Sequence, residues 1–290
     1  MFYYNLAITQ PLDLRETFRC GQCFRWREIE DNKFAGIVED FYVEMTFEKG
    51  QLHIASTKDT GEDYWRHYLD LDRDYEGLMA KFIARDDLIA KAYKAYPGMK
   101  ILNQDAYEML ISFIISSNNN ILRISKIIEN LAQTFGEAIL VEGEVKGYGF
   151  PALEKLASAS LEELKACNLG YRADYIASTS KSLLAEEADL NQLKQLSYSA
   201  ARTEIMAYKG IGGKVADCIL LFGMEKAEAF PMDTWVKKIM KHFYLPVEKP
   251  SEKELKACIQ ANFENVGGII QQFLFHYIRN HDFILKNKEN

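Results

Sequence analysis

A glycine-rich turn within residues 206–218 connects two predicted helices, and this arrangement limits the folds that the chain can adopt. The segment reads Met206-Ala207-Tyr208-Lys209-Gly210-Ile211-Gly212-Gly213-Lys214-Val215-Ala216-Asp217-Cys218. This pattern predicts the end of one helix, a hairpin with three glycines, and the start of a second helix. The glycines leave backbone N–H groups free to point outward, and the positive end of the second helix points the same way. The hairpin is therefore predicted to bind an anion, and phosphate is the expected one.

Two ionisable residues follow this turn and suggest chemistry. Lys214 falls in the first turn of the second helix, and Asp233 follows a short loop that contains Pro231. The positive helix end and partial desolvation both favour the neutral lysine amine, which is a nucleophile. Asp233 is expected to cap the next helix and to offer a carboxylate to a developing positive charge. The alternative is that Lys214 is an ordinary surface lysine and that Asp233 only caps a helix. The hairpin beside both residues makes this alternative less favoured.

The composition is that of a globular chain outside the membrane. Its 290 residues are 48% hydrophobic and 27% charged, and no apolar run has the length of a membrane span. The N-terminus lacks the basic start and apolar core of an export signal, so we expect an intracellular protein rather than a secreted one. The five cysteines suggest a reducing compartment. Cys20 and Cys23 have no second ligand pair at metal-binding spacing, which favours a structural over a metal or redox role.

The net charge of −7 argues weakly against a nucleic-acid partner. Binding depends on local patches rather than on the sum, however. Basic residues gather around the hairpin and the helix after it: Lys209, Lys214, Lys237, Lys238, Lys241 and His242. Further candidates, if the fold brings them together, are Arg19, Arg25, Arg123 and Arg172.

The periodicity of the chain changes near residue 56. Residues 1–56 alternate as strands do, with turn signals at 31–32, 39–40 and 49–50. From about residue 59 apolar residues recur at three and four, which predicts helices, with breaks at 96–98, 147–151 and 169–171 and a last helix at about 267–283. We therefore predict an α+β fold: a small N-terminal antiparallel sheet domain (residues 1–100, with flanking helices) packed on a helical domain (residues 101–290) that holds the hairpin.

Four segments then occur in a characteristic order. They are Cys20-Gly21-Gln22-Cys23-Phe24-Arg25-Trp26, Ser116-Ser117-Asn118-Asn119-Asn120-Ile121, Leu169-Gly170-Tyr171-Arg172-Ala173, and Gly212-Gly213-Lys214-Val215-Ala216-Asp217-Cys218 with Pro231-Met232-Asp233. With them, nearly the whole chain resembles the 8-oxoguanine DNA glycosylases, which are helix-hairpin-helix glycosylases with a catalytic lysine and aspartate. A glycine hairpin alone would be weak evidence, because non-enzymatic DNA-binding proteins also have it.

The resemblance implies a base-excision reaction. The family flips a damaged nucleotide out of the duplex, because the glycosidic bond cannot be reached inside the stack. Lys214 matches the lysine that attacks the sugar C1′, forms a Schiff base and permits β-elimination, and Asp233 matches the aspartate that stabilises the cationic sugar. No redox cofactor or catalytic metal is implied. Similar hairpins suggest a monovalent cation at the carbonyls of Met206, Tyr208 and Ile211.

The resemblance also assigns a lesion pocket. N7 is an acceptor in guanine and carries a hydrogen in 8-oxoguanine, so a backbone carbonyl aimed at N7 accepts from the lesion and repels the normal base. Gly21 matches the residue that supplies this carbonyl. The alternative interpretation is that Gly21 is a turn glycine before a strand at 24–26. Phe275 and Cys218 match the residues that sandwich the base. Without the resemblance, both would be interpreted as residues of the hydrophobic core. Gln271 matches the residue that binds the Watson–Crick edge, and would otherwise be a solvated helix position.

The partner implied is duplex DNA with 8-oxoguanine opposite cytosine, bound by a monomer. Asn118, Arg123 and Arg172 match the residues that read the orphaned cytosine, and Tyr171 matches the aromatic wedge beside them. Gly210 and Gly212 belong to the phosphate-binding hairpin. Two positions depart from the pattern. Lys209 replaces the usual hairpin proline and adds a cation expected to face phosphate, and Trp235 replaces a histidine, leaving only its indole N–H as a donor.

Two other functions remain open on the sequence. An alkylated-purine glycosylase of the same superfamily uses the aspartate without a lysine nucleophile, and Lys214 and Gly21 argue against it. A non-catalytic DNA-binding module would explain the hairpin but neither Asp233 nor the Gly21 segment. The acidic net charge suits all three functions poorly.

Overall fold

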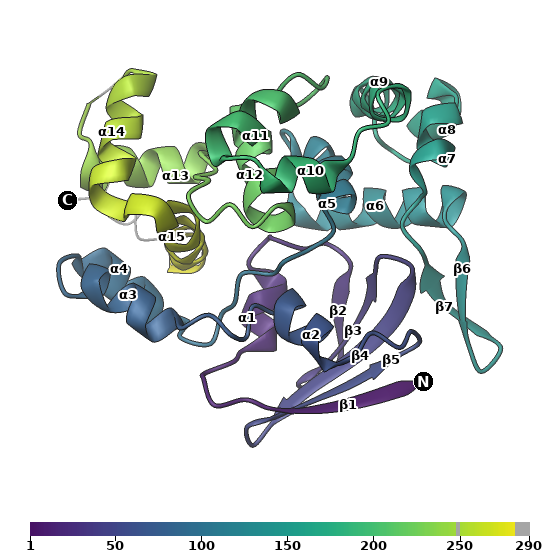
Figure 1. Ribbon diagram of the computed structural model, residues 1–290, viewed down its shortest axis with the longest axis horizontal. Coiled ribbons are helices and arrows are strands. Elements are labelled where there is room, and N and C mark those ends of the chain that lie inside the picture. Colours follow the sequence, from purple (N-terminus) through teal and green to yellow (C-terminus); the bar gives the residue numbers. More distant parts are fainter. Residues whose placement is uncertain (248–249, 282–290) are drawn as a thin grey trace.

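The computed structural model describes residues 1–247 and 250–281. An antiparallel sheet occupies one side of the molecule and helices cover the other (Figure 1), so the α+β prediction is confirmed. The sheet has the order β1-β5-β4-β3-β2. Its strands are β1 (Phe2–Ala7), β2 (Trp26–Glu30), β3 (Lys33–Val38), β4 (Phe41–Glu48) and β5 (Gln51–Ser56). The turns predicted at 31–32, 39–40 and 49–50 join β2 to β5 in succession, and Asn32, Glu39 and Lys49 adopt positive φ there.

One face of the sheet is buried under two short helices, α1 (Leu14–Arg19) and α2 (Glu62–Tyr68). The ring of Phe18 on α1 stacks on Trp26, with centroids 4.0 Å apart. Trp26 in turn covers Gly36, its cross-strand partner, because a Cβ on Gly36 would lie 2.6 Å from the indole. The prediction of strands throughout residues 1–56 was wrong at α1, and the predicted strand at 24–26 begins only at Trp26.

Thirteen further α-helices lie in the described part of the chain. They are α3 (Tyr75–Ile83), α4 (Asp87–Ala95), α5 (Ala106–Ser116), α6 (Ile121–Phe135), α7 (Leu153–Ser158), α8 (Leu161–Ala166), α9 (Arg172–Ala185), α10 (Leu190–Gln195), α11 (Tyr198–Ile205), α12 (Gly213–Gly223), α13 (Thr234–Ile239), α14 (Glu252–Phe263) and α15 (Gly267–His281). A π-helical turn, Met240–Tyr244, continues α13, and a 3-10 turn, Glu264–Val266, precedes α15. The last helix begins at the predicted residue, and residues 282–283 lie outside the described ranges.

A second, two-stranded sheet interrupts the helices, which the periodicity did not predict. Strands β6 (Ala138–Val141) and β7 (Glu144–Tyr148) form a hairpin whose turn contains Gly143 at φ +82°. The hairpin projects from the helical layer beside the large sheet (Figure 1). Ile139 and Val141 pack there against a small buried cluster that includes Ile37 and Tyr42. This contact ties the two parts of the molecule together.

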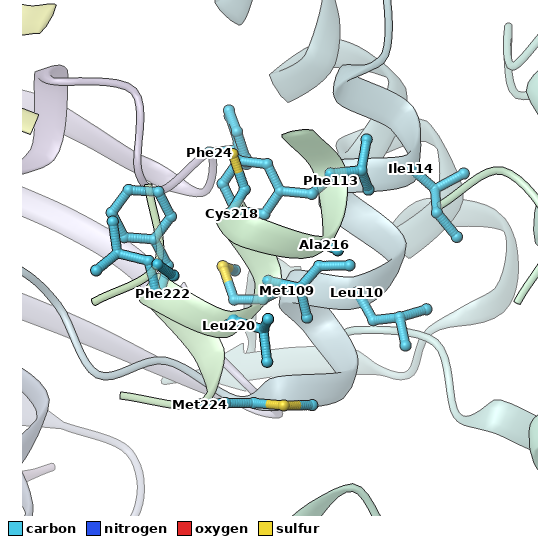
Figure 2. Close-up of a cluster of buried hydrophobic side chains, with 14 of the residues drawn as sticks. Phe24, Met109, Leu110, Phe113, Ile114, Ala216, Cys218, Leu220, Phe222 and Met224 are labelled. Carbon is cyan, nitrogen blue, oxygen red and sulfur yellow. The ribbon is translucent and has the colours of Figure 1, made fainter. Parts of the chain in front are cut away.

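The core of the helical part lies between α5 and α12 and extends to the N-terminal part. Figure 2 shows Phe113 of α5 beside Cys218 of α12 and close to Phe24, which precedes β2. The rings of Phe113 and Phe222 stack at 5.5 Å, and Phe24 meets Phe113 edge-on at 5.6 Å. Each such fully buried side chain stabilises the fold by about 1.5–3 kcal/mol. The packing fixes α12, and with it Lys214, relative to the N-terminal sheet. The domain boundary at residue 100 stays a prediction.

Candidate functional site

The glycine hairpin joins α11 to α12, as predicted. Gly210 has φ +86°, and the ring of Tyr175 occupies the space that its side chain would need. Gly212 is the N-cap of α12, and no side chain caps that helix within the described residues. The first N–H groups of α12 are thus left to an external acceptor, as an anion site requires.

Lys214 lies in the first turn of α12 and is half-buried. Its Nζ donates to Ser116 Oγ at the end of α5, 3.2 Å away, and lies 5.5 Å from the centre of the Phe113 ring. The amine is therefore held against an aromatic face rather than extended into solvent. This geometry provides the partial desolvation expected of a nucleophilic lysine.

Asp233 is the N-cap of α13, because its Oδ1 accepts from the backbone N–H of Val236 at 2.8 Å. The capping interpretation is therefore confirmed. The same carboxylate lines a pocket together with Lys214. Oδ2 takes part in no hydrogen bond with the described residues, so one oxygen is left for chemistry in the pocket.

The pocket has a volume of about 60 Å³. It is lined by Gly21, Phe113, Lys214, Cys218, Phe222, Pro231, Asp233, Gln271, Gln272 and Phe275. Six of these were predicted from the sequence, and they come from the α1–β2 loop, α12, the start of α13 and α15. Phe113, Phe222 and Gln272 were not predicted, since only the packing of helices shows that they reach this place. Burial raises the pKa of the Cys218 thiol to about 11, so that wall of the pocket is uncharged at neutral pH.

The α1–β2 loop that carries Gly21 is held rigidly. Gly21 has φ +90°, and a Cβ there would lie 3.1 Å from Ile121 Cδ1. The buried amide of Gln22 donates to the carbonyls of Thr17 and Lys100, each at 2.8 Å, and accepts from the N–H of Leu102 at 2.9 Å. These bonds fix the backbone from which the Gly21 carbonyl projects.

The neighbouring thiols belong to this structural network. Cys20 and Cys23 are buried, and burial raises the pKa of Cys20 to about 11. In the part of the chain that the structure describes, no three His, Cys, Asp or Glu side chains lie close enough together to hold a metal ion.

The residues predicted to read the opposite base gather at the turn after α5. Asn118 is exposed at φ +50°, and the exposed Tyr171 donates its hydroxyl to the carbonyl of Ser117 at 3.2 Å. Arg172 is buried: it donates from Nε to the Ser117 carbonyl at 3.0 Å and from Nη2 to the Asn118 carbonyl at 3.0 Å. Arg123 is exposed in the first turn of α6. The turn directly follows Ser116, so this group adjoins Lys214.

The basic residues predicted to gather around the hairpin and α13 differ in their surroundings. Lys237, Lys238 and Lys241 are exposed on and after α13, and Lys238 Nζ lies 4.9 Å from the ring centre of Trp235. Lys209 instead forms an ion pair with Asp174 on α9, at 2.6 Å. The expectation that Lys209 faces phosphate stays a prediction. None of the described helices is long and apolar enough to cross a membrane.

Known proteins resemble the chain over nearly its full length. A family model described as 8-oxoguanine DNA glycosylase, N-terminal domain, matches residues 5–110, and one described as HhH-GPD superfamily base excision DNA repair protein matches residues 111–265. A probable N-glycosylase/DNA lyase of Methanothermobacter thermautotrophicus is 30% identical over 92% of this chain and 93% of its own. The N-glycosylase/DNA lyase of Saccharomyces cerevisiae is 32% identical over 89% of this chain and 75% of its own.

A solved structure shows the same likeness in three dimensions. It is the 8-oxoguanine glycosylase/lyase of Clostridium acetobutylicum in complex with double-stranded DNA containing cytosine opposite 8-oxoG. It matches with a TM-score of 0.86 at 34% identity and covers 94% of each chain. Fold and site together define a base-excision DNA glycosylase of the helix-hairpin-helix superfamily. Within that class, the chain belongs to the 8-oxoguanine DNA glycosylase family.

Proposed function

We propose that this protein excises 8-oxoguanine from duplex DNA, opposite cytosine, and then cleaves the strand as a lyase. The observation that supports this most is the meeting of Lys214, Asp233 and Gly21 in one pocket, although they come from three distant segments. The lysine provides the nucleophile, the aspartate a carboxylate, and the glycine a carbonyl to read the lesion. Neither a non-catalytic DNA-binding module nor an alkylated-purine glycosylase needs all three.

The chemistry follows from the position of the amine. The neutral Lys214 nitrogen attacks C1′ and forms the C1′–N bond, while the C1′–N9 bond breaks and its electron pair leaves with the base. The amine loses a proton, the base gains one, and opening of the sugar gives a Schiff base. Loss of a C2′ proton then expels the 3′ phosphate by β-elimination. The free oxygen of Asp233 stabilises the cationic sugar in the first step.

Lesion recognition falls to the pocket walls. The base lies between Phe275 and the protonated thiol of Cys218, and the Gly21 carbonyl accepts from its N7–H. Gln271 is buried, and its Oε1 has no partner among the described residues, which suits an acceptor for the donors on the Watson–Crick edge. The plainer reading of Gln271 as a solvated helix position is wrong, because only 3% of its surface is exposed.

The remaining contacts hold the duplex. Asn118, Arg123 and Arg172 read the orphaned cytosine, and Tyr171 wedges into the stack. Arg172 also keeps the Ser117–Asn118 turn in place. The N–H groups after Gly210 and Gly212 bind a backbone phosphate, and the Trp235 indole donates to another. The protein acts in the cell compartment that holds DNA.

The hairpin carbonyls of Met206, Tyr208 and Ile211 are proposed to bind a monovalent cation. The Tyr208 carbonyl accepts from the N–H of Ile211 at 3.3 Å. It therefore keeps one lone pair for a cation.

Borohydride trapping on an 8-oxoguanine:cytosine duplex tests this function. The wild-type enzyme should form a covalent adduct, and Lys214→Gln should abolish both the adduct and base release while binding to lesion DNA persists. Lys165→Gln, an exposed lysine of α8, is the matched control and should trap normally. Efficient trapping by the Lys214→Gln variant would refute the assignment of the nucleophile.

A further inference from the structure

Helix α15 places Arg279 in one row with two residues that line the pocket. Gln271, Phe275 and Arg279 are spaced by four, so their side chains follow one another along one helix face. Gln271 and Phe275 line the lesion pocket. The guanidinium carbon of Arg279 lies 5.3 Å from the centre of the Phe275 ring. Arg279 thus continues the row beyond the residue proposed to stack on the base.

Arg279 holds an unused hydrogen-bond donor at a fixed place. Its Nη2 donates to the carbonyl of Arg19 at 2.9 Å, which anchors the guanidinium to the end of α1, two residues before Gly21. Its Nη1 is buried and has no hydrogen-bond partner in residues 1–247 and 250–281. Nη1 lies 3.5 Å from the point that a Cβ of Gly21 would occupy. The donor therefore sits beside the glycine whose carbonyl is proposed to read N7.

Buried polar atoms without partners are rare, and two of them lie in this row on either side of Phe275. One is an acceptor, Gln271 Oε1, and the other is a donor, Arg279 Nη1. A purine held against Phe275 has its Watson–Crick edge at one end and its C8–N7 edge at the other. The 8-oxoguanine C8–N7 edge has a donor, N7–H, next to an acceptor, O8, whereas guanine has C8–H at the latter position. The Gly21 carbonyl complements the donor, which leaves O8 to be matched.

We propose that Arg279 donates from Nη1 to O8 of the flipped lesion and is a second specificity-determining residue beside Gly21. This inference rests on the proposed function, since it requires the base to enter this pocket. Guanine would leave the buried donor unpaired, so Arg279 disfavours the normal base at the same time. The anchor to Arg19 holds the donor in place before the base arrives, so little ordering is needed on binding.

The test is a double-substitution cycle that changes both the side chain at position 279 and the exocyclic atom bonded to C8. Single-turnover base release is measured on duplexes with 8-oxoguanine or 8-thioguanine opposite cytosine, because the thio base keeps N7–H but has a weaker acceptor at C8. Arg279→Met keeps an unbranched stem over Phe275 and removes the donors. If this variant does not fold, as judged by circular dichroism, Arg279→Leu, which also lacks donors, replaces it. Lyase activity on an abasic site provides the base-free control.

The wild-type enzyme should release the oxo base about tenfold to a hundredfold faster than the thio base, as the loss of a hydrogen bond to a charged donor predicts. The Arg279 variant should lose most of this preference and release 8-oxoguanine correspondingly more slowly, with lyase activity changed less than about twofold. An equal oxo-to-thio ratio in the wild type and the variant would overturn the inference, because Arg279 would then only position the loop. Equal loss of release and lyase activity would overturn it too. A wild-type enzyme that releases neither base but cleaves abasic DNA would instead overturn the proposed function.

Discussion

At the scale of single residues, Asp233 combines a helix cap with a carboxylate in the pocket. Asp233→Asn keeps an N-cap of similar strength and removes the charge. We expect base release to slow by about a hundredfold or more while the melting temperature changes little. Single-turnover kinetics and a thermal melt measure the two effects. Asp189→Asn makes the same change at the cap of α10 and should alter neither. Parallel losses of activity and stability at Asp233 would leave it only a capping role.

The sequence predicts single residues well where a motif requires a particular chemical group. The hairpin motif and the loop after it point to Lys214 and Asp233, the family resemblance points to Gly21 and Gln271, and these four residues share one pocket. Residues whose importance comes from burial escape this reasoning. The resemblance matches Arg172 to a residue that reads the orphaned cytosine, and only the structure shows that its guanidinium also donates to backbone carbonyls of the turn after α5. Arg279 has no motif at all, because only the folded chain sets its unpaired donor beside Gly21.

At the scale of elements, two arginines lie at the N-terminal ends of α6 and α9, Arg123 and Arg172, and we expect them to have different roles. Arg123→Ala should relax the preference for cytosine over adenine opposite the lesion without lowering the melting temperature, because this side chain is exposed. Arg172→Ala should relax the preference and also destabilise the protein by about 2 kcal/mol, since it removes buried charged donors from two carbonyls. Release rates on the two duplexes and denaturant melts separate the cases. An unchanged cytosine-to-adenine ratio in both variants would refute the reading role of this surface.

The elements that sequence reasoning missed share a physical cause. Helix α1 is only six residues long, so its apolar spacing cannot be told from strand alternation. Its N-cap, Asp13, is too weak a signal to predict a helix without a longer apolar pattern. The β6–β7 hairpin is stabilised by packing against Ile37 and Tyr42 of the large sheet, which lie about a hundred residues earlier in the sequence and therefore leave no local signal. Long helices such as α6 were predictable because their apolar face repeats over several turns.

At the scale of the whole molecule, a buried ion pair lies where three parts meet. Arg25, next to β2, has its Nη1 3.5 Å from a carboxylate oxygen of Glu108 on α5. The same guanidinium donates to the carbonyl of Glu39 at 3.3 Å and to that of Tyr148 at the end of β7. Burial raises the pKa of Glu108 to about 7, an effect that Arg25 offsets only in part.

This raised pKa predicts a pH dependence of stability. Between about 4.5 and 7 the folded state keeps the Glu108 proton that the unfolded chain has lost, so this group's contribution to the free energy of unfolding falls as pH rises. The full effect is on the order of 3 kcal/mol. Glu108→Gln cannot titrate, and the variant should therefore gain stability relative to wild type between pH 5 and pH 8. Denaturant melts at both pH values measure the difference, and a pH-independent difference would contradict the prediction.

The lesion pocket draws its walls from opposite ends of the chain. The hydrogen bond from Gln272 to the carbonyl of Cys20, at 2.9 Å, joins residues 252 positions apart. During synthesis on the ribosome, the N-terminal sheet, the hairpin and Lys214 all emerge before α15 does. A nascent chain can therefore carry Lys214 while the helix that holds Gln271, Phe275 and Arg279 is still inside the exit tunnel. Under the proposed function, a chain without this last helix has no Gln271 or Phe275 to hold a flipped base, so selection of the damaged base requires the completed helix.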